Sequence, residues 1–191
     1  PFVADGWGHF TKRQLAKAEE SRISSFGIVD LVGIPKDRFY LYRSHWAPEK
    51  QTIHILPHWN WPERVGKNTP VYVYTSGDSA ELFLNGKSLG KRTKNPNAEV
   101  IRDRYALRWL EVPYRPGELK AVAYRNGRKL GSAIMRTAGE PARLRLTADR
   151  TALKADGEDL SYVLVEALDQ DGNPCPLAMN DVQFTVTGPA A

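Results

Sequence analysis

Residues 80–90 read AELFLNGKSLG, and this stretch predicts the strand–turn–strand pattern that recurs along much of the chain. Leu82 and Leu84 alternate with other side chains, as in a strand with one buried face. Asn85-Gly86 is a strong signal for a two-residue hairpin turn, because both residue types tolerate positive φ. We therefore expect the chain to reverse here and to return as an antiparallel strand.

The same period of two recurs on both sides of this hairpin. It is seen in the pairs Ile53/Ile55, Val71/Val73, Leu107/Trp109 and Leu119/Ala121. A second Asn-Gly turn, at residues 126–127, precedes a returning strand at residues 130–135. Strands at this spacing are typical of a small β-sandwich, which we place at residues 50–138.

The N-terminal part has a different pattern. Residues 26–34 form a short apolar run, as in strands that are buried on both faces of a parallel sheet. Pro35 then suits the first turn of a helix. Aromatic residues follow at helical spacing: Phe39, Tyr42 and Trp46. A capping-box pattern also predicts a short helix over residues 11–22. Residues 26–47 are therefore expected to form a single strand–helix unit within an N-terminal region that we place at 1–49.

Residues 139–141, Gly-Glu-Pro, predict a linker. Further strand patterns follow at 144–146, 162–168 and 182–186. Residues 139–191 are expected to hold only part of an immunoglobulin-like sandwich, which needs about 100 residues. Because both ends of the sequence look like cuts through a larger protein, we expect exposed strand edges and self-association.

Composition excludes several classes of protein. The 191 residues are 41% hydrophobic and 26% charged, which argues for a folded chain. The absence of an apolar run of about 18 residues excludes a membrane-spanning helix. One cysteine, Cys175, excludes an internal disulfide and a multi-cysteine zinc site. The net charge of +5 is spread along the sequence, so we expect no nucleic-acid partner. We also expect no membrane partner, no metal and no cofactor.

Several motifs have a simpler structural interpretation. Residues 86–90 match the G-x-S-x-G pattern of serine hydrolases, but a hairpin turn is predicted there instead of a strand–helix elbow. Residues 169–173 resemble the start of a calcium loop, yet the later ligand positions do not match, which favours a turn. His54 and His58 would lie roughly 13 Å apart on a strand, too far to share a metal. The densest basic cluster is expected to be a solvated loop: Lys87, Lys91, Arg92 and Lys94.

Residues 58–61, His-Trp-Asn-Trp, are the most unusual segment. Indole faces stack on sugar rings, and polar groups beside them fix hydroxyls. Trp59, Trp61 and His58 are therefore candidates for carbohydrate binding. The other interpretation is that both indoles pack against a neighbouring sheet or helix, and exposure of the two side chains decides between them.

Several longer stretches resemble bacterial β-galactosidase-like members of glycoside hydrolase family 2. Residues 26–31 (FGIVDL), 35–42 (PKDRFYLY) and 44–46 (SHW) resemble the last strand and helix of that family's barrel. The domain that follows the barrel is similar to three segments: 54–61 (HILPHWNW), 70–74 (PVYVY) and 80–90. Residues 140–191 resemble the immunoglobulin-like module that comes next.

The resemblance implies a mainly β chain: immunoglobulin-like β-sandwich domains with a short α/β remnant of a (β/α)8 barrel at the N-terminus. It also implies a parent enzyme that hydrolyses β-glycosides with retention, using two glutamates. In the family the acid/base glutamate follows an asparagine, and no Asn-Glu pair occurs in this sequence. The catalytic pair is therefore expected to precede residue 1.

Two functions follow from these expectations. The chain is either a non-catalytic C-terminal accessory region that buttresses the barrel, or a carbohydrate-binding module that uses Trp59 and Trp61. Asp30 would lie at the C-terminal end of the last barrel strand and could line the sugar pocket, or it could cap a loop. Carbohydrate is the expected partner, through the parent enzyme, and the family suggests a bacterial periplasmic or extracellular location.

Overall fold

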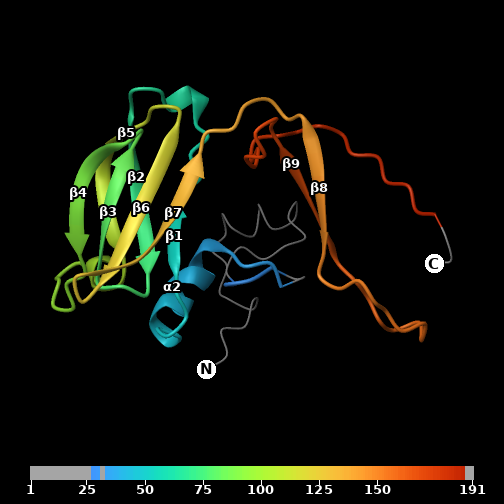
Figure 1. Ribbon diagram of the computed structural model, residues 1–191, viewed down its shortest axis with the longest axis horizontal. Helices are drawn as coiled ribbons and strands as arrows, with labels where there is room; N and C mark the ends of the chain where they lie inside the picture. The colour runs from blue at the N-terminus through green and yellow to red at the C-terminus, as the bar shows by residue number, and fades with distance from the viewer. Residues whose placement is uncertain (1–26, 31–32, 188–191) are drawn as a thin grey trace, which may run out of the picture. The chain divides into compact units, whose positions relative to one another are not determined.

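The computed structural model of the chain describes residues 27–30 and 33–187 and divides into two compact units (Figure 1). The first unit extends to Thr137, and the second begins at Ala138. In the described part the fold is mainly β, as predicted, with few helices. The finer assignment of residues 1–49, 50–138 and 139–191 to three domains stays a prediction, and the helix predicted over 11–22 lies outside the described residues.

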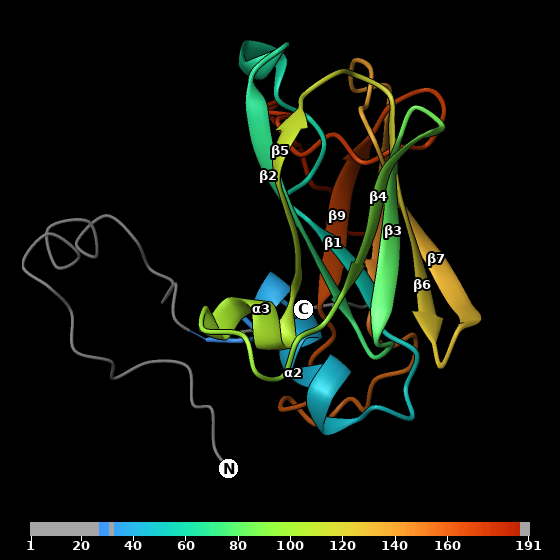
Figure 2. The ribbon, with the colours of Figure 1, turned by 90° about the vertical axis from the view of Figure 1, so that its left-hand side faces the viewer.

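The described part of the first unit contains two antiparallel sheets (Figure 2). One has the order β1-β2-β5 and the other the order β4-β3-β6-β7. The strands are β1 (Ile53–Leu56), β2 (Asn68–Thr75), β3 (Ser79–Leu84), β4 (Lys87–Thr93), β5 (Leu107–Pro113), β6 (Glu118–Arg125) and β7 (Arg128–Arg136). This arrangement agrees with the predicted β-sandwich.

Buried side chains at alternate strand positions of both sheets form one hydrophobic core. Val71 and Val73 of β2 are fully buried, as are Leu82 of β3 and Leu119 of β6. Their neighbours along each strand point to the opposite face, because successive strand side chains alternate. The period of two in the sequence therefore identifies much of this core.

Both predicted Asn-Gly hairpins are present. Asn85 and Gly86 join β3 to β4 with φ angles of 48° and 80°. Asn126 and Gly127 join β6 to β7 with φ angles of 51° and 77°. Two successive positive φ values give the turn a twist that matches antiparallel strands, which is why this dipeptide sets the register of both hairpins.

Helix α2 (Asp37–Trp46) confirms the helix predicted after Pro35. The strand predicted at 26–34 is not formed in the described residues of that stretch, where the β structure is an isolated bridge between Val29 and Pro35. A parallel strand needs hydrogen-bonded neighbours. Here the backbone N–H of Lys36 donates to the carbonyl of Ile28 instead, so the segment pairs with itself.

Two short helices were not predicted: the 3-10 helix η1 (Pro62–Arg64) and α3 (Ile101–Tyr105). Each is about one turn long, too short for a periodic pattern to show in the sequence. None of the helices in the described ranges is long and apolar enough to cross a membrane.

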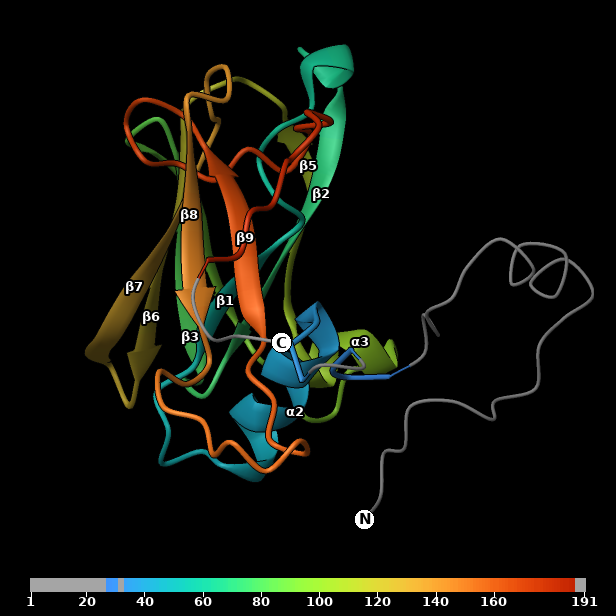
Figure 3. The same cartoon turned by 90° about the vertical axis from the view of Figure 1, so that its right-hand side faces the viewer.

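The second unit contains an antiparallel pair, β8 (Arg143–Ala148) and β9 (Val163–Leu168) (Figure 3). Residues 169–172 form the predicted turn, with Gly172 at φ 85°. The strand predicted at 182–186 is wrong, since this segment has no strand pairing in the structure and Phe184 is 69% exposed. Alternation alone cannot form a strand where no neighbouring strand offers hydrogen bonds. Self-association through such exposed side chains stays a prediction.

Replacing Leu82 by Ala should strongly destabilise the first unit, because it leaves a cavity between the two sheets. The expected loss is about 2–5 kcal/mol in the free energy of unfolding, measured by urea denaturation. Ile134→Ala on β7 is the matched control, since Ile134 is 42% exposed, and it should cost less than about 1 kcal/mol. Equal losses in the two variants would contradict the assignment of Leu82 to the core.

Candidate functional site

Trp59 lies inside the first unit. Its side chain is fully buried, and its indole N–H donates a hydrogen bond to the carbonyl of Arg115 at 2.9 Å. The indole also packs against the ring of Tyr114, with the ring centroids 4.8 Å apart. A buried indole with a satisfied N–H is a packing residue.

Tyr114 and Thr137 hold the backbone around Trp59. The Tyr114 hydroxyl accepts a hydrogen bond from the backbone N–H of Trp61 at 3.1 Å. The Thr137 hydroxyl donates to the carbonyl of Trp59 at 2.7 Å and accepts from the N–H of Gly117 at 3.1 Å. Sequence reasoning missed these residues. The available signal was a tyrosine directly after a strand, where a buried hydroxyl needs a partner.

Trp61 and His58 form a stacked pair at the edge of this core. Their ring centroids are 4.2 Å apart with an interplanar angle of 16°, and the Trp61 indole N–H donates to the His58 carbonyl at 2.7 Å. The Nδ1 atom of His58 is buried and has no hydrogen-bond partner within the part of the chain that the structure describes. Burial lowers the pKa of His58 below its usual value, against smaller opposing effects of Asp37 and Glu63. His58 is therefore neutral at pH 7.

These positions correct one prediction. A sugar platform would need both indoles on one open face, and Trp59 is enclosed by Tyr114, Arg115 and Thr137. Carbohydrate binding through Trp59 therefore has no support in this structure. For Trp61 and His58, carbohydrate binding stays a prediction.

Asp30 closes a short turn. Its Oδ1 atom accepts the backbone N–H of Ile34 at 2.7 Å, and its own N–H donates to the carbonyl of Ile34 at 3.0 Å. These contacts fit the interpretation of Asp30 as a loop-capping residue. A role in lining a sugar pocket stays a prediction.

His54 is not paired with His58. Its Nε2 atom is 2.7 Å from Oδ1 of Asp37, and its ring stacks on Tyr40 at 4.0 Å between centroids. His54 therefore belongs to the contact between α2 and β1. Among the described residues, no group of three or more His, Cys, Asp and Glu side chains could hold a metal ion.

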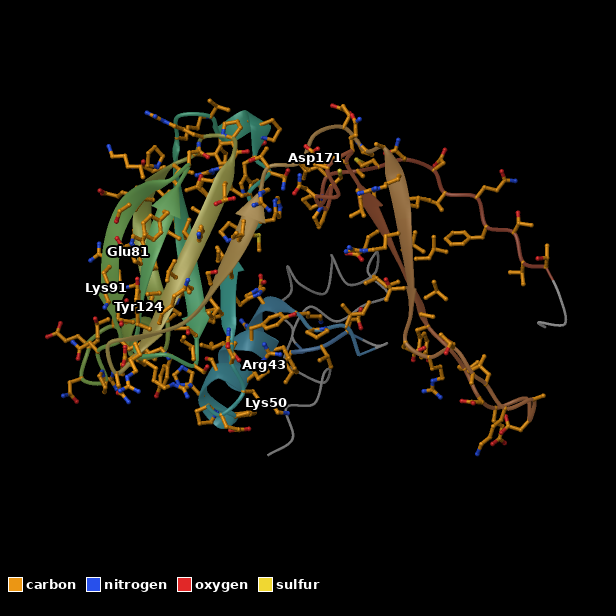
Figure 4. The ribbon with its side chains drawn as sticks, in the orientation of Figure 1. Arg43, Lys50, Glu81, Lys91, Tyr124 and Asp171 are labelled. Atoms are coloured by element: carbon orange, nitrogen blue, oxygen red, sulfur yellow. The ribbon has the colours of Figure 1, made fainter. Side chains whose placement is uncertain are left out.

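The remaining motifs are structural. Ser88 of the G-x-S-x-G pattern lies on β4, and its hydroxyl donates to Glu81 on β3 at 2.5 Å. Beside it, the Lys91 ammonium lies 4.3 Å from the centre of the Tyr124 ring, and Figure 4 shows Glu81, Lys91 and Tyr124 together on one sheet. The basic cluster is thus carried mostly by a strand rather than by a loop, and Lys94 differs from its neighbours in being partly buried.

The chain is similar to several known glycosidases. Residues 144–191 match glycoside hydrolase family 2 C-terminal domain 5, and residues 66–131 match a domain of unknown function, DUF4982. β-Galactosidase BoGH2A of Bacteroides ovatus is 46% identical over 169 residues, which cover 88% of this chain. The chain belongs to glycoside hydrolase family 2.

Solved structures from the same family share the fold. A family 2 member from Bacteroides cellulosilyticus is 37% identical with a TM-score of 0.69, covering 81% of this chain and 22% of its own. A β-glucuronidase from glycoside hydrolase family 2 is 34% identical with a TM-score of 0.73, covering 86% of this chain and 16% of its own. The chain spans 19% of the length of the Bacteroides ovatus β-galactosidase.

Replacing His58 by Phe should flatten the decline in stability on acidification. The pKa of His58 is lowered in the folded chain, so below about pH 6.5 the unfolded chain binds a proton that the folded chain does not. Its contribution to stability is present above pH 6.5 and is lost as the pH falls through that value. Phe keeps the stack on Trp61 but does not titrate.

Urea denaturation at intervals between pH 5.5 and 8.5 measures this difference. The free energy of unfolding of His58→Phe should fall less than that of the parent chain between pH 7.5 and 5.5. Between pH 7.5 and 8.5, where His58 is neutral in both states, the two curves should run parallel. Parallel curves over the whole range would show that His58 does not contribute.

Proposed function

We propose that this chain is a non-catalytic accessory region of a glycosidase that hydrolyses β-glycosides with retention. The proposal is supported by relatives that are named as a β-galactosidase and a β-glucuronidase. It is also supported by the match of residues 144–191 to a C-terminal domain of the family. The sequence lacks the Asn-Glu pair that would carry the acid/base glutamate.

Within this proposal, residues 1–49 are the C-terminal remnant of a (β/α)8 barrel, with α2 as its last helix; the strand at 26–34 would form only beside the neighbouring strands of the whole barrel. Residues 50–138 are the β-sandwich that follows it, and residues 139–191 are part of an immunoglobulin-like domain. The helix α2 directly after Pro35 and the two sheets of the first unit support this division.

The observation that carries the proposal is the attachment of α2 to the first sheet. His54 of β1 binds Asp37 at the start of the helix and stacks on Tyr40 one turn later. The guanidinium Nε of Arg43, labelled in Figure 4, donates to the hydroxyl of Thr52 at 3.0 Å. The helix is thus held by a hydrogen-bonded ring stack near its start and a side-chain hydrogen bond near its end.

Part of α2 is exposed. Trp46 stacks on Tyr42 at 4.6 Å between ring centroids, yet 57% of it is accessible to solvent. Within this proposal, the stacked pair of Tyr42 and Trp46 packs against another domain. We assign this surface to the catalytic domain of the same longer polypeptide, since the chain spans only 19% of the Bacteroides ovatus relative. The sandwich would then hold the last barrel helix in place.

The 191-residue chain is expected to hydrolyse neither an aryl β-galactoside nor an aryl β-glucuronide. In affinity electrophoresis it should migrate equally with and without β-linked polysaccharides, because Trp59 is buried and offers no stacking face. A Trp61→Ala variant run in parallel should behave in the same way. Turnover that survives repurification would overturn the non-catalytic assignment, and retardation that disappears in the variant would favour a carbohydrate-binding module.

His54→Ala should loosen α2 without unfolding the sandwich. Loss of the Asp37 hydrogen bond and of the Tyr40 stack should raise amide hydrogen exchange in residues 37–46 by about tenfold. Trp46→Ala on the same helix is the control, because Trp46 is largely exposed, and exchange should stay close to that of the parent chain. Equal exchange in His54→Ala and the parent chain would show that His54 does not hold the helix.

A further inference from the structure

A cavity of about 390 Å³ in the first unit has no role in the packing described so far. It lies between the C-terminal end of α2, the turn after β2 and the segment that leads into α3. Its lining consists of Ser44, His45, Pro48, Ser76, Lys94, Pro96, Arg104 and Tyr105. These residues come from segments far apart in the sequence, so the cavity exists only in the folded chain.

The lining is rich in cations and hydroxyl groups. Lys94 and Arg104 supply two positive charges, and His45 adds an imidazole. Among the described residues that line the cavity, none is acidic. A site of this composition favours an anion, because cationic and hydroxyl groups donate strong hydrogen bonds to oxyanions.

Lys94 is held in place by the backbone around it. Its ammonium group donates to the carbonyl of Thr75 at 2.5 Å, and its backbone N–H donates to the carbonyl of Asp78 at 2.9 Å. An ammonium group has three protons, and this side-chain hydrogen bond uses one of them. Lys94 is therefore positioned at the cavity with donor capacity beyond its protein contact.

A further cation adjoins the cavity wall. The guanidinium of Arg125 donates to the carbonyls of Pro48 and Ser76, at 2.6 and 2.7 Å. Both of these residues line the cavity. Arg125 thus fixes two parts of the wall and adds positive charge beside Lys94.

Burial disfavours the charged forms of two groups in the lining, Lys94 and His45. Burial is the main cause that lowers the pKa of Lys94 to about 8; Asp78 opposes this shift, and Arg125 adds to it by a smaller amount. Burial also lowers the pKa of His45, with Lys94 acting in the same direction. A bound anion would relieve the repulsion at both groups.

A larger cavity nearby is less suited to an anion. It measures about 480 Å³ and is lined by residues of β4, β5 and α3. Its Arg108 is already bound to Asp103 in a two-pronged ion pair, and Glu111 lies in the same lining. With two carboxylates, Asp103 and Glu111, beside its cations, this lining offers less to an added anion, so the smaller cavity is the better anion site.

We propose that the cavity at Lys94 binds an oxyanion, namely the carboxylate or sulfate group of a small ligand or of an acidic sugar. Lys94 and Arg104 would bind the oxygen atoms, and the hydroxyl groups of Ser76 and Tyr105 would complete the site, since the Ser44 hydroxyl already donates to the carbonyl of Leu41. The proposal does not depend on the accessory function of the chain, since it concerns only the chemistry of this cavity.

The test uses the 191-residue chain labelled with carbon-13 at the lysine ε-carbons. The titration of Lys94 is followed by NMR from pH 6 to 10, alone and with sodium sulfate, glucuronate or galactose. Sulfate or glucuronate should raise the pKa of Lys94 from about 8 by roughly one unit, because a bound anion favours the ammonium form. Galactose, which is neutral, should leave it unchanged.

Calorimetry at pH 7 then tests the residue itself. Lys94→Gln should weaken binding of the effective anion by about tenfold or more. Lys87→Gln, at the exposed start of β4, is the matched control and should retain the parent affinity. Arg104→Gln serves as a second variant if Lys94→Gln does not fold, and it should weaken binding similarly.

A response of the Lys94 titration to one anion supports the proposal and identifies the kind of site. A response to glucuronate alone identifies a carboxylate site, and a response to sulfate alone identifies a sulfate site. An unchanged Lys94 titration with both anions would overturn the proposal without any variant. Equal loss of affinity in Lys94→Gln and Lys87→Gln would also overturn it, because that result indicates only a general effect of net charge.

Discussion

The burial of Trp59 is the constraint on which the rest of the first unit depends. Its indole joins the segment after β1 to the carbonyl of Arg115, and its backbone carbonyl is bound by Thr137 at the end of β7. These partners are 56 and 78 residues away in sequence. Removing a buried tryptophan side chain costs about 3–5 kcal/mol, so this contact fixes the position of the whole 58–61 segment relative to both sheets.

The attachment of α2 follows from the same arrangement. His54 of β1 lies against the helix, where it contacts Asp37 and Tyr40. The two histidines of this region thus make different contacts: His54 contacts α2, and His58 stacks on the indole of Trp61. A structural use of the aromatic side chains agrees better with an accessory region than with a sugar-binding surface.

The cations of the first unit are found in two settings: beside a partner on the sheet surface, or in the lining of a cavity. On the exposed sheet face, cations have nearby partners, as with Lys91 on the Tyr124 ring and Arg136 on Glu118 at 2.7 Å. At the end of α2, by contrast, Lys94 and Arg104 line a cavity without an acidic residue in its described lining. Surface ion pairs contribute little to stability, whereas concentrated positive charge in a partly buried site favours ligand binding.

The sequence by itself determined the features that depend on near neighbours. Alternation identified the strands around Val71, Leu82 and Leu119, and the Asn-Gly pairs located both hairpins, because strand period and turn φ angles are local properties. The same local reasoning failed at 26–34 and 182–186, where no neighbouring strand completes the pairing in the described residues. Family resemblance was also visible in the sequence, and the comparisons confirmed it.

Tertiary structure alone decided the interpretation of Trp59 and the position of Lys94. Whether Trp59 stacks on a sugar or packs in the core depends on Tyr114, Arg115 and Thr137, which reach it only after both sheets have formed. The position of Lys94 is a similar case, since its sequence neighbours are exposed while its own ammonium group turns to Thr75. Burial and hydrogen bonding between distant segments are properties of the packed chain, and no local pattern encodes them.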